Sequence, residues 1–423
     1  MTGADGGGEA RAASYREVFG VPEFRALFAA QLASVVGDQF ARVALTVMVY
    51  ASTGSAALTA LTYALTFLPQ LVAGPLLGGL ADRYPRRGVM VAADLARAVL
   101  VAAMAVPGLP LAGVCALLVA VQLLAAPFNA ARAATLPLIL AGDRYVVAGA
   151  VSNLTHQLAQ LLGFAAGGVL VAGVEPTGAL LVDAATFAVS AAVIGRGVRR
   201  RPAPAPVTGG PATVPGEGWA ARLVAGARLV GGDRRQRALL WLLCVCAVPV
   251  VAEALAVPYA DDLGAGPAAV GLLLAAGPAG AVVGMLLIRR LAPATRLRLV
   301  RPLATASCAV LVGCAARPPL APTIALWLLS GAAMGYFVVA NAELVLAVPD
   351  GRRGQVVGLV SAAVRAAQGV AVLVAGAAAE LLAPAMVVAA AGGLGAVAAA
   401  AAATGWLRAG AAAGAGAPAG GAA

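Results

Sequence analysis

Long apolar runs recur along the whole chain, separated by short segments rich in Gly, Pro and Arg. Each run is about as long as the roughly 20 residues that an α-helix needs to cross a hydrocarbon layer about 30 Å thick. Helices suit this environment because each one satisfies its own backbone hydrogen bonds. The runs do not alternate apolar and polar residues, as the strands of an outer-membrane barrel would. We therefore expect an all-α membrane protein.

The composition excludes a soluble globular protein. Charged residues make up 11% of the 423 residues, against about 25% in a typical soluble domain. The start of the chain lacks the basic-then-apolar layout of a cleaved signal peptide, so we expect the first span to be retained. The five cysteines lie in or near apolar runs and lack metal-ligand spacing. They are expected to pack as small apolar residues, and no metal or cofactor is expected.

Twelve spans are expected, six on each side of a polar interruption between Arg196 and Arg237. The interruption contains a Pro/Gly stretch, Pro202–Gly218, and then an amphipathic piece, Trp219–Val230, which is typical of a helix lying on the inner leaflet. The predicted spans are Phe24–Tyr50, Ala56–Leu80, Val89–Val106, Leu111–Phe128, Val146–Val174, Thr177–Ile194, Ala238–Tyr259, Ala268–Ile288, Pro302–Ala315, Thr323–Val348, Gln355–Leu382 and Pro384–Leu407.

This pattern predicts five segments along the chain. They are a cytoplasmic N-terminal segment, 1–23; an N-terminal six-helix half, 24–195; a basic cytoplasmic linker, 196–237; a C-terminal six-helix half, 238–408; and a disordered tail, 409–423.

The placement of arginine predicts the topology. The net charge is +11, and all the basic residues are Arg because the chain contains no Lys. Basic residues in short loops mark the cytoplasmic side of a membrane protein. The loops of one side hold Arg83, Arg86, Arg87, Arg144, Arg289, Arg290, Arg296, Arg298, Arg301, Arg352 and Arg353, and the other side holds Glu175, Asp261, Asp262, Arg317 and Glu380. We expect a monomer in the bacterial inner membrane with both termini cytoplasmic. The placement of arginine on one side of the membrane also explains the positive net charge, so nucleic-acid binding is not needed to account for it.

The two halves show signs of duplication. Gly74–Gly78 precedes Asp82–Arg83, and the similar stretch Gly280–Gly284 precedes Ile288–Arg289 in the second half. Two six-span repeats around a basic loop are the parallel-repeat arrangement of facilitator transporters.

The segment from Gly78 to Arg87, GGLADRYPRR, resembles the signature loop between the second and third helices of the major facilitator superfamily. Pro85 stands where the family usually has Gly, and Ile288 replaces the acid in the second half. The resemblance implies a twelve-helix fold of two six-helix pseudo-repeats with a central cavity. It also implies a cytoplasmic gate in which acid and arginine side chains hold one conformation. The expected gate residues are Gly78, Asp82, Arg83, Arg86 and Arg87.

Two further stretches are similar to one branch of this superfamily, the macrolide-efflux and enterobactin exporters. Pro127–Pro137 resembles the end of the fourth helix in that branch, and Phe24–Asp38 resembles its first helix. In the fifth span, Gly163–Gly168 resembles the antiporter motif, with Phe164 in place of its proline. The branch implies export of a small molecule, such as a drug or macrolide in antibiotic resistance.

Charged residues inside a span are functional candidates, since each costs at least about 2.5–3.5 kcal/mol to insert. In the first span, Gln31, Ser34, Asp38 and Arg42 recur on one helical face, which we expect to line the cavity. Asp38 and Arg42 lie four residues apart and are expected to pair. Asp38 is then either a protonatable coupling carboxylate tuned by Arg42 or half of a static salt bridge.

The fifth and eleventh spans carry similar polar faces. His156, the only histidine, is either a group that contacts substrate and titrates near neutral pH or a hydrogen-bonded packing residue. Arg365 is expected to meet an anionic substrate or a structural partner such as Glu343. The candidate cavity residues on these two spans are Asn153, His156, Gln160, Ser361, Arg365 and Gln368.

Other buried acids compete for the coupling role. Asp183 and Glu253 are alternatives to Asp38, whereas Asp94 and Arg97 are expected to support the gate near the cytoplasmic end. Three threonines, Thr59, Thr62 and Thr66, share one face of the second span. They are weak evidence for a cavity lining, because a threonine hydroxyl also hydrogen-bonds the backbone of its own helix.

These observations predict a secondary active transporter that works by alternating access and is driven by protons. Without Lys the chain has no phosphate-binding loop for ATP. Within transporters, a siderophore exporter and a nutrient importer are alternatives. A membrane scaffold or sensor that transports nothing is an alternative from another class. A membrane-embedded enzyme would need clustered catalytic acids, histidines or metal ligands, so we expect no enzyme activity.

Overall fold

The computed structural model describes residues 15–140, 143–202, 230–348 and 353–415, together with residues 224, 227 and 228. The N-terminal segment before Tyr15, most of the Pro/Gly stretch and most of the amphipathic piece of the linker lie outside the described residues. Every regular element in the described part is a helix, which confirms the predicted all-α fold.

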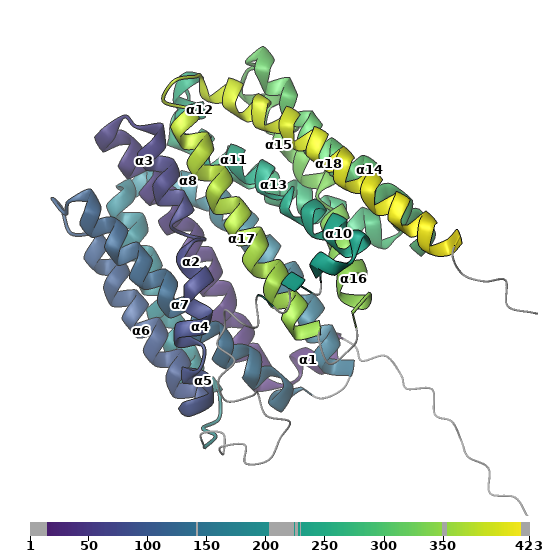
Figure 1. Ribbon diagram of the computed structural model, residues 1–423. Coiled ribbons are helices and arrows are strands. Elements are labelled where there is room, and N and C mark those ends of the chain that lie inside the picture. The colour runs from purple at the N-terminus through teal and green to yellow at the C-terminus, as the bar shows by residue number, and fades with distance from the viewer. Residues whose placement is uncertain are drawn as a thin grey trace, which may run out of the picture.

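The helices follow one another with short connections in each half (Figure 1). Those of the first half are α1 (Tyr15–Phe19), α2 (Pro22–Thr53), α3 (Ala56–Ala64), α4 (Pro69–Leu77), α5 (Leu80–Arg83), α6 (Arg86–Met104), α7 (Leu111–Ile139) and α8 (Asp143–Gly197). Those of the second half are α10 (Arg234–Cys244), α11 (Ala247–Ala254), α12 (Ala256–Asp262), α13 (Pro267–Arg289), α14 (Pro293–Ala309), the 3-10 helix η1 (Val310–Ala316), α15 (Leu320–Ala333), α16 (Tyr336–Leu346), α17 (Arg353–Ala378) and α18 (Pro384–Ala415).

The described helices supply twelve membrane crossings. Ten candidate spans are long and apolar enough by themselves. One of these, Thr155–Gly197, is 43 residues long and contains Glu175 at φ 64°, a sharp turn that divides it into two crossings. The twelfth crossing is α6, whose 19 residues include Asp94 and Arg97. The predicted number of spans is therefore confirmed for the part of the chain that the structure describes.

Proline explains why some predicted spans are broken into shorter helices. The predicted seventh span is divided into α10, α11 and α12, with breaks at Val245–Cys246 and Leu255. Each break lies three to four residues before a proline, Pro249 or Pro258, because the proline ring displaces the carbonyl four residues earlier and offers no N–H. Pro69 divides the second span into α3 and α4 in the same way.

The last helix is longer than the sequence predicted. We expected a disordered tail from residue 409, but α18 continues to Ala415. Alanine has the highest helix propensity, which explains why an Ala-rich segment extends the helix beyond the span. Residues 416–423 lie outside the described part of the chain.

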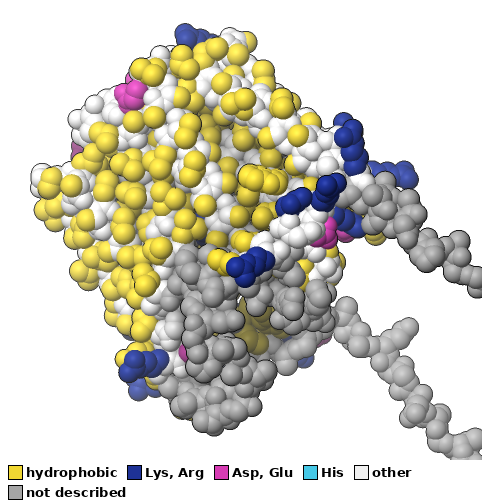
Figure 2. Space-filling view, in the orientation of Figure 1, with side chains coloured by type: hydrophobic (Ala, Val, Ile, Leu, Met, Phe, Trp, Pro, Cys, Tyr) yellow, Lys and Arg dark blue, Asp and Glu magenta, His cyan; other side chains and the backbone are white. Residues whose placement is uncertain are grey.

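The two ends of the helical bundle differ in charge. We call the end that carries α5 and the start of α8 the basic end, and the end that carries Glu175, Asp261, Asp262 and Glu380 the acidic end. In Figure 1 the acidic end lies at the top, beside α12, and the basic end lies at the bottom, beside α1 and α5. Apolar side chains dominate the upper and left parts of the face in Figure 2, and arginines lie at its top, at its lower left and across its right half.

The halves share a buried core toward the acidic end. The largest apolar cluster contains Leu45 and Phe164 of the first half together with Leu255 and Leu273 of the second. Helix α8 packs extensively on α2 of its own half and on α13 of the other, and α17 packs on α3. At the basic end, by contrast, α5 packs on α6 and α7 of its own half. Among the described residues, the contacts between the two halves are therefore concentrated toward the acidic end.

Candidate functional site

A buried network of charges lies inside the first half and is centred on Arg97 of α6. Its guanidinium donates to both carboxylate oxygens of Asp38 on α2, at 3.0 and 3.3 Å. On its other side it lies 3.7 Å from Asp94, one turn earlier on α6, and 3.5 Å from the hydroxyl of Ser34. The guanidinium carbon also stacks 4.0 Å from the centre of the Phe187 ring. One cation therefore lies between two carboxylates.

Asp183 of α8 adds a third carboxylate to this network. It is 1% exposed, and Thr186 donates to its Oδ1 at 3.2 Å, whereas its Oδ2 has no hydrogen-bond partner among the described residues. The charges of Asp38 and Arg97 act on it. Gly37 makes this approach of α2 and α8 feasible, because a Cβ there would overlap Thr186 and Asp183.

The network reaches solvent on one side only. The side chains of Arg97 and Asp94 are 4% and 0% exposed, whereas that of Asp38 is 28% exposed. Ser190 donates to Asp94 at 2.5 Å, which completes the buried side. Asp38 is therefore the member of the network that a proton from water can reach directly.

A second cluster joins the two halves near the middle of the spans. The hydroxyl of Tyr63 on α3 donates to Glu253 of α11 at 2.7 Å. The guanidinium of Arg42 lies over three aromatic rings, 5.3 Å from Tyr63 and 5.7 Å from both Phe67 and Phe164. Such stacking stabilises a partly desolvated guanidinium through the negative face of each ring.

The polar face of the first span is arranged differently from the prediction. Asp38 and Arg42 were expected to pair, but Asp38 binds Arg97 and Arg42 stacks on aromatic rings. The face was also expected to line the cavity. Of its members, Ser34 is buried against α6, whereas Gln31, Asp38 and Arg42 are half-buried, and the Gln31 carbonyl accepts from Arg132 of α7 at 2.7 Å. Tertiary partners on α6 and α7 have replaced the neighbour one turn along α2.

The charges around His156 come from both halves. Its side chain lies exposed on α8, and the charged groups that act on it are Asp38, Arg42, Arg132 and Arg365. These four belong to α2, α7 and α17. We take this exposed side chain, among charges of both halves, to mark the space between the halves that the fold implies. Gln160, one turn along α8, is half-buried, and the side chain of Asn153 lies outside the described residues.

The eleventh span contributes Arg365 to this space. Glu343 was expected as a structural partner, but it binds Arg235 at 3.5 Å. Among the described residues, no acid forms an ion pair with Arg365. Gln368 instead donates to the thiol of Cys246 at 3.9 Å, and Ser361 is exposed.

Sequence reasoning assigned Asp94 and Arg97 to gate support and gave Arg132 no role of its own. The structure places Arg97 at the centre of the buried network, and it places Arg132 against Gln31 of α2, near enough to His156 for its charge to act there. One signal in the sequence points to Arg97, because a guanidinium inside an apolar span is costly wherever it occurs. Arg132 follows the predicted end of the fourth span at Phe128, so the same signal did not apply to it.

The gate motif makes its visible contacts inside the first half. Arg86 donates to the carbonyl of Ala134 at 2.8 Å, and Arg87 donates to the carbonyl of Gly195. Asp82 is exposed, and Arg83 lies over the ring of its neighbour Tyr84 at 5.9 Å. Among the described residues, none of these contacts crosses between the halves in this conformation.

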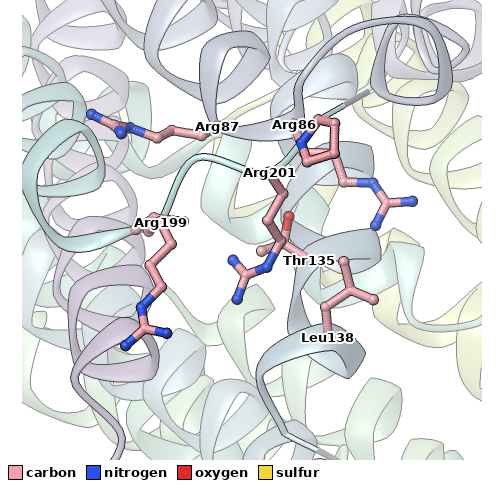
Figure 3. Close-up of a pocket in the computed structure, with 8 residues that line it drawn as sticks. Arg86, Arg87, Thr135, Leu138, Arg199 and Arg201 are labelled. Carbon is pink, nitrogen blue, oxygen red and sulfur yellow. The ribbon is translucent and has the colours of Figure 1, made fainter. Parts of the chain in front are cut away.

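The same arginines border a pocket at the basic end (Figure 3). The pocket has a volume of about 230 Å³ and is lined by Arg86, Arg87, Arg199 and Arg201, with Thr135 and Leu138 among its other walls. Glu23 of α2 is an acid beside it and pairs with Arg199 at 3.2 Å and Arg201 at 2.8 Å. The pocket is therefore strongly basic.

Comparison with known proteins now identifies the family. The family model of the Major Facilitator Superfamily matches residues 27–258, more than half of the chain. The chain belongs to this superfamily. No curated protein is similar enough in sequence to be recognised as a relative.

Three solved transporter structures illustrate the similarity in fold. A bacterial homologue of the human lysosomal transporter Spinster, inward-facing and unoccupied, is 15% identical, with 92% of this chain and 96% of that chain covered and a TM-score of 0.62. A bacterial homologue of the iron transporter ferroportin, also inward-facing, is 16% identical, with 94% and 99% covered and a TM-score of 0.64. A nucleoside transporter is 11% identical, with 91% and 99% covered and a TM-score of 0.69.

These findings establish the coarse function. The chain is a multi-pass membrane protein with the fold of major facilitator transporters. The solved neighbours move different cargo, so their identities extend no further than the fold.

Proposed function

We propose that this chain is a secondary active transporter that exports a small molecule, such as a drug or macrolide, in exchange for protons. The observation that supports it best is the arrangement of Arg97 between Asp38 and Asp94, with only Asp38 reached by water. Such a network has two stable pairings, and the protonation of one carboxylate decides between them.

The proposed coupling begins with a proton on Asp38. A neutral Asp38 holds Arg97 less strongly, so the guanidinium moves toward Asp94 and Asp183. Because Asp38 lies on α2 and its partners lie on α6 and α8, the change alters the contacts among three helices that enclose the central space. A bistable contact of this kind is what converts a local change of charge into a movement of whole helices.

Protons can supply the required energy. One charge crossing a membrane at about 100 mV provides roughly 2.3 kcal/mol, and a pH difference adds to it. Glu253 is an alternative proton carrier in this proposal, because it lies at the interface of the halves and bonds Tyr63. Asp183 is a further alternative, because one of its oxygens is buried and has no hydrogen-bond partner among the residues that the structure describes.

The proposed transport cycle opens the central space to one side at a time. The hydrogen bonds found between the halves, from Tyr50 to Asp261, from Ser55 and Ala57 to Glu380, and from Tyr63 to Glu253, lie at the acidic end or mid-span. This conformation is consequently closed at the acidic end. We propose that the basic end faces the cytoplasm, in agreement with its arginines, so the conformation is open to the inside.

Anionic lipid is a proposed partner of the basic end. The contacts that Arg86 and Arg87 make with described residues are to neutral carbonyls, so their charges stay available to phosphate groups at the membrane surface. Each basic residue near an anionic leaflet contributes about 1 kcal/mol to the attraction. We further propose that the protein is a monomer of the bacterial inner membrane.

Three other functions remain in view as alternatives. A siderophore exporter or a nutrient importer would use the same fold, and a scaffold or sensor would move nothing. We expect no enzyme activity in any of these cases. The proposed direction, export, depends on the resemblance of the first and fourth helices to the macrolide-efflux and enterobactin exporters.

The decisive experiment measures accumulation of a panel of radiolabelled small molecules in cells with and without the protein. Export predicts lower accumulation of at least one compound in expressing cells, and this difference should vanish when an ionophore collapses the proton gradient. Higher accumulation would instead indicate an importer. Equal accumulation across the panel, with the protein present in the membrane, would favour a scaffold and contradict the proposal.

A further inference from the structure

Within the described part of the chain, two arginines beside the central space have no acidic partner. Arg132 of α7 donates to the neutral amide of Gln31, and Arg365 of α17 has no ion pair among the described residues. The Nε of Arg132 is buried and finds no hydrogen-bond partner in the described part of the chain. A charge kept inside a membrane protein at a cost of about 2.5–3.5 kcal/mol or more, and left unpaired, requires a counter-charge from elsewhere.

The packing of α17 shows that Arg365 faces the first half. Gly369 packs against Leu68, and Gly376 packs against Ala57 and Ala60, so these glycines mark the face of α17 that touches α3 and its neighbour α4. Residues 365, 369 and 376 lie on one face of a helix with 3.6 residues per turn. Arg365 therefore continues that face toward the basic end, where the halves separate.

Arg132 reaches the same space from the first half. Its charge and that of Arg365 both lie near enough to act on His156, which is exposed on α8. Arg42 is the third cation that acts there, and it is held over aromatic rings. The space is therefore lined by guanidiniums from both halves.

The acids nearby do not neutralise these guanidiniums. Asp38 is the acid that acts on His156, and it is bonded to Arg97. Asp94 and Asp183 lie buried behind Arg97, and Glu253 accepts from Tyr63 beside Arg42. Arg132 and Arg365 are left as the charges that an incoming molecule meets.

We infer that the transported molecule is an organic anion, whose carboxylate or phosphate group is held between Arg132 of the first half and Arg365 of the second. This inference rests on the proposed transport function and names its substrate class. Guanidinium groups recognise carboxylate and phosphate by paired, charge-assisted hydrogen bonds. Among the proposed cargoes, it favours acidic molecules over drugs whose amines are protonated at neutral pH.

The same geometry links binding to alternating access. Without an anion, like charges on α7 and α17 repel each other and favour the conformation that is open at the basic end. A bound anion neutralises both and removes this repulsion, so the halves can approach. A ligand shifts a conformational equilibrium only by its differential affinity for the two states, and contact with both halves supplies that difference.

The test measures binding to the full-length protein in detergent, by thermal unfolding at constant ionic strength. The probes are benzoate and phenyl phosphate, with benzylamine and benzyl alcohol as cationic and neutral controls of similar size. We expect the two anions to raise the unfolding temperature in a concentration-dependent way and the controls to leave it unchanged. Arg132→Gln and Arg365→Gln should each weaken this effect at least about tenfold, the loss expected for a charged hydrogen-bonded contact.

Two controls separate binding from folding. Arg317→Gln changes an arginine of a loop at the acidic end, away from the central space, and should keep the native response. Arg365→Gln without probe should be at least as stable as the native protein, since it removes an unpaired charge from a span. A merely structural arginine would give the opposite result, lower stability with the anion response retained.

Two results with the small probes would overturn the inference: equal stabilisation by benzylamine and the anions, or an unchanged response in both arginine variants. Stabilisation by added phosphatidylglycerol alone would also overturn it, because it would place a lipid and not a transported molecule between the arginines. Anion binding without proton-dependent transport would instead contradict the proposed function, and the anion site between the two arginines would stand.

Discussion

Tyr63 of the first half donates a 2.7 Å hydrogen bond to Glu253 of the second half, across 190 positions of sequence. The phenol is fully buried, and Arg42 lies 5.3 Å from its ring centre. The bond therefore lies under the closed acidic end, beside the central space. It exists only while the halves are together on that side, so it favours the inward-open state of the proposed cycle.

Replacing this tyrosine should shift the conformational equilibrium. Tyr63→Phe removes a hydrogen bond to a carboxyl group, which is typically worth about 1.5–3 kcal/mol, or roughly 10- to 150-fold between two states. We expect a larger population open at the acidic end. The distance distribution between spin labels at Ala51 and Leu381, exposed residues near that end on opposite halves, measures it in a cysteine-free background.

The matched control for this change is Tyr145→Phe, which removes a hydroxyl from a tyrosine that is 44% exposed near the start of α8. It should leave the label distances unchanged. Unchanged distances in Tyr63→Phe as well would show that the bond does not contribute to closure.

A close backbone contact at Gly168 of α8 and Gly271 of α13 supports the same closure. A Cβ added at Gly168 would lie 2.6 Å from the Cα of Gly271, closer than real Cβ atoms approach. Gly168→Ala must therefore push α8 and α13 apart, and overpacking of this kind costs about 1–3 kcal/mol. We expect a wider label distance at the acidic end and a lower transport rate.

Gly173, on the same helix, has no atom within 4 Å of an added Cβ. Gly173→Ala should consequently match the native protein in both label distance and rate. Equal effects of the two substitutions would mean that helix propensity, and not the contact between α8 and α13, is responsible.

Glu380 gives the acidic end a dependence on pH. It follows α17 and accepts from the Ser55 hydroxyl at 2.7 Å and the Ala57 amide at 2.8 Å, at the start of α3. These hydrogen bonds, that of the Ala57 amide first, lower the pKa of Glu380 below its ordinary value. A lowered pKa means that the closed state favours the ionised carboxylate.

The sign of the effect follows from this direction. The contribution of Glu380 to closure is fully present above the ordinary glutamate pKa of about 4.3 and is lost as the pH falls through the lowered value. We expect label distances that are constant between about pH 5 and 8 and that widen at lower pH. Tyr50, Asp261 and Asp262 also face this region, so the comparison is with Glu380→Gln, in which the widening should be smaller. An equal response in both proteins would assign it to Asp261 or Asp262.

The fold was predictable because its signals are local and repeated. Apolar runs gave the spans, alternating arginines gave the two ends, and Pro69, Pro249 and Pro258 explain the broken helices once the structure is known. The extension of α18 to Ala415 was missed because an Ala/Gly-rich tail is ambiguous between helix and coil.

The site was predictable only in part, because its contacts are long-range. The sequence identified Asp38 as an ionisable group inside a span, but it offered Arg42, four residues away, as the partner. The actual partner, Arg97, is 59 positions distant and reaches Asp38 because α6 packs in the same half. Spacing along one helix cannot show which neighbouring helix supplies the counter-charge.

The buried network around Arg97 gives the last prediction, which separates coupling from folding. Asp38→Asn keeps the size of the side chain and leaves Asp94 beside Arg97, so the protein should remain folded in the membrane while proton-driven transport is lost. Arg97→Gln leaves three carboxyl groups without a cation, and breaking a buried pair in this way typically costs about 3–5 kcal/mol. We expect a clearly lower unfolding temperature for Arg97→Gln than for Asp38→Asn.

The double variant, Asp38→Asn together with Arg97→Gln, completes a double-mutant cycle for this ion pair. It removes one carboxylate together with the cation, so it should be more stable than Arg97→Gln alone, and transport should stay uncoupled from protons. Two residues in contact show a coupling energy of this sort, whereas independent residues give additive effects. Additive losses of stability would show that the 3.0 Å contact contributes nothing to folding. Proton-driven transport that persists in Asp38→Asn would move the coupling role to Glu253 or Asp183.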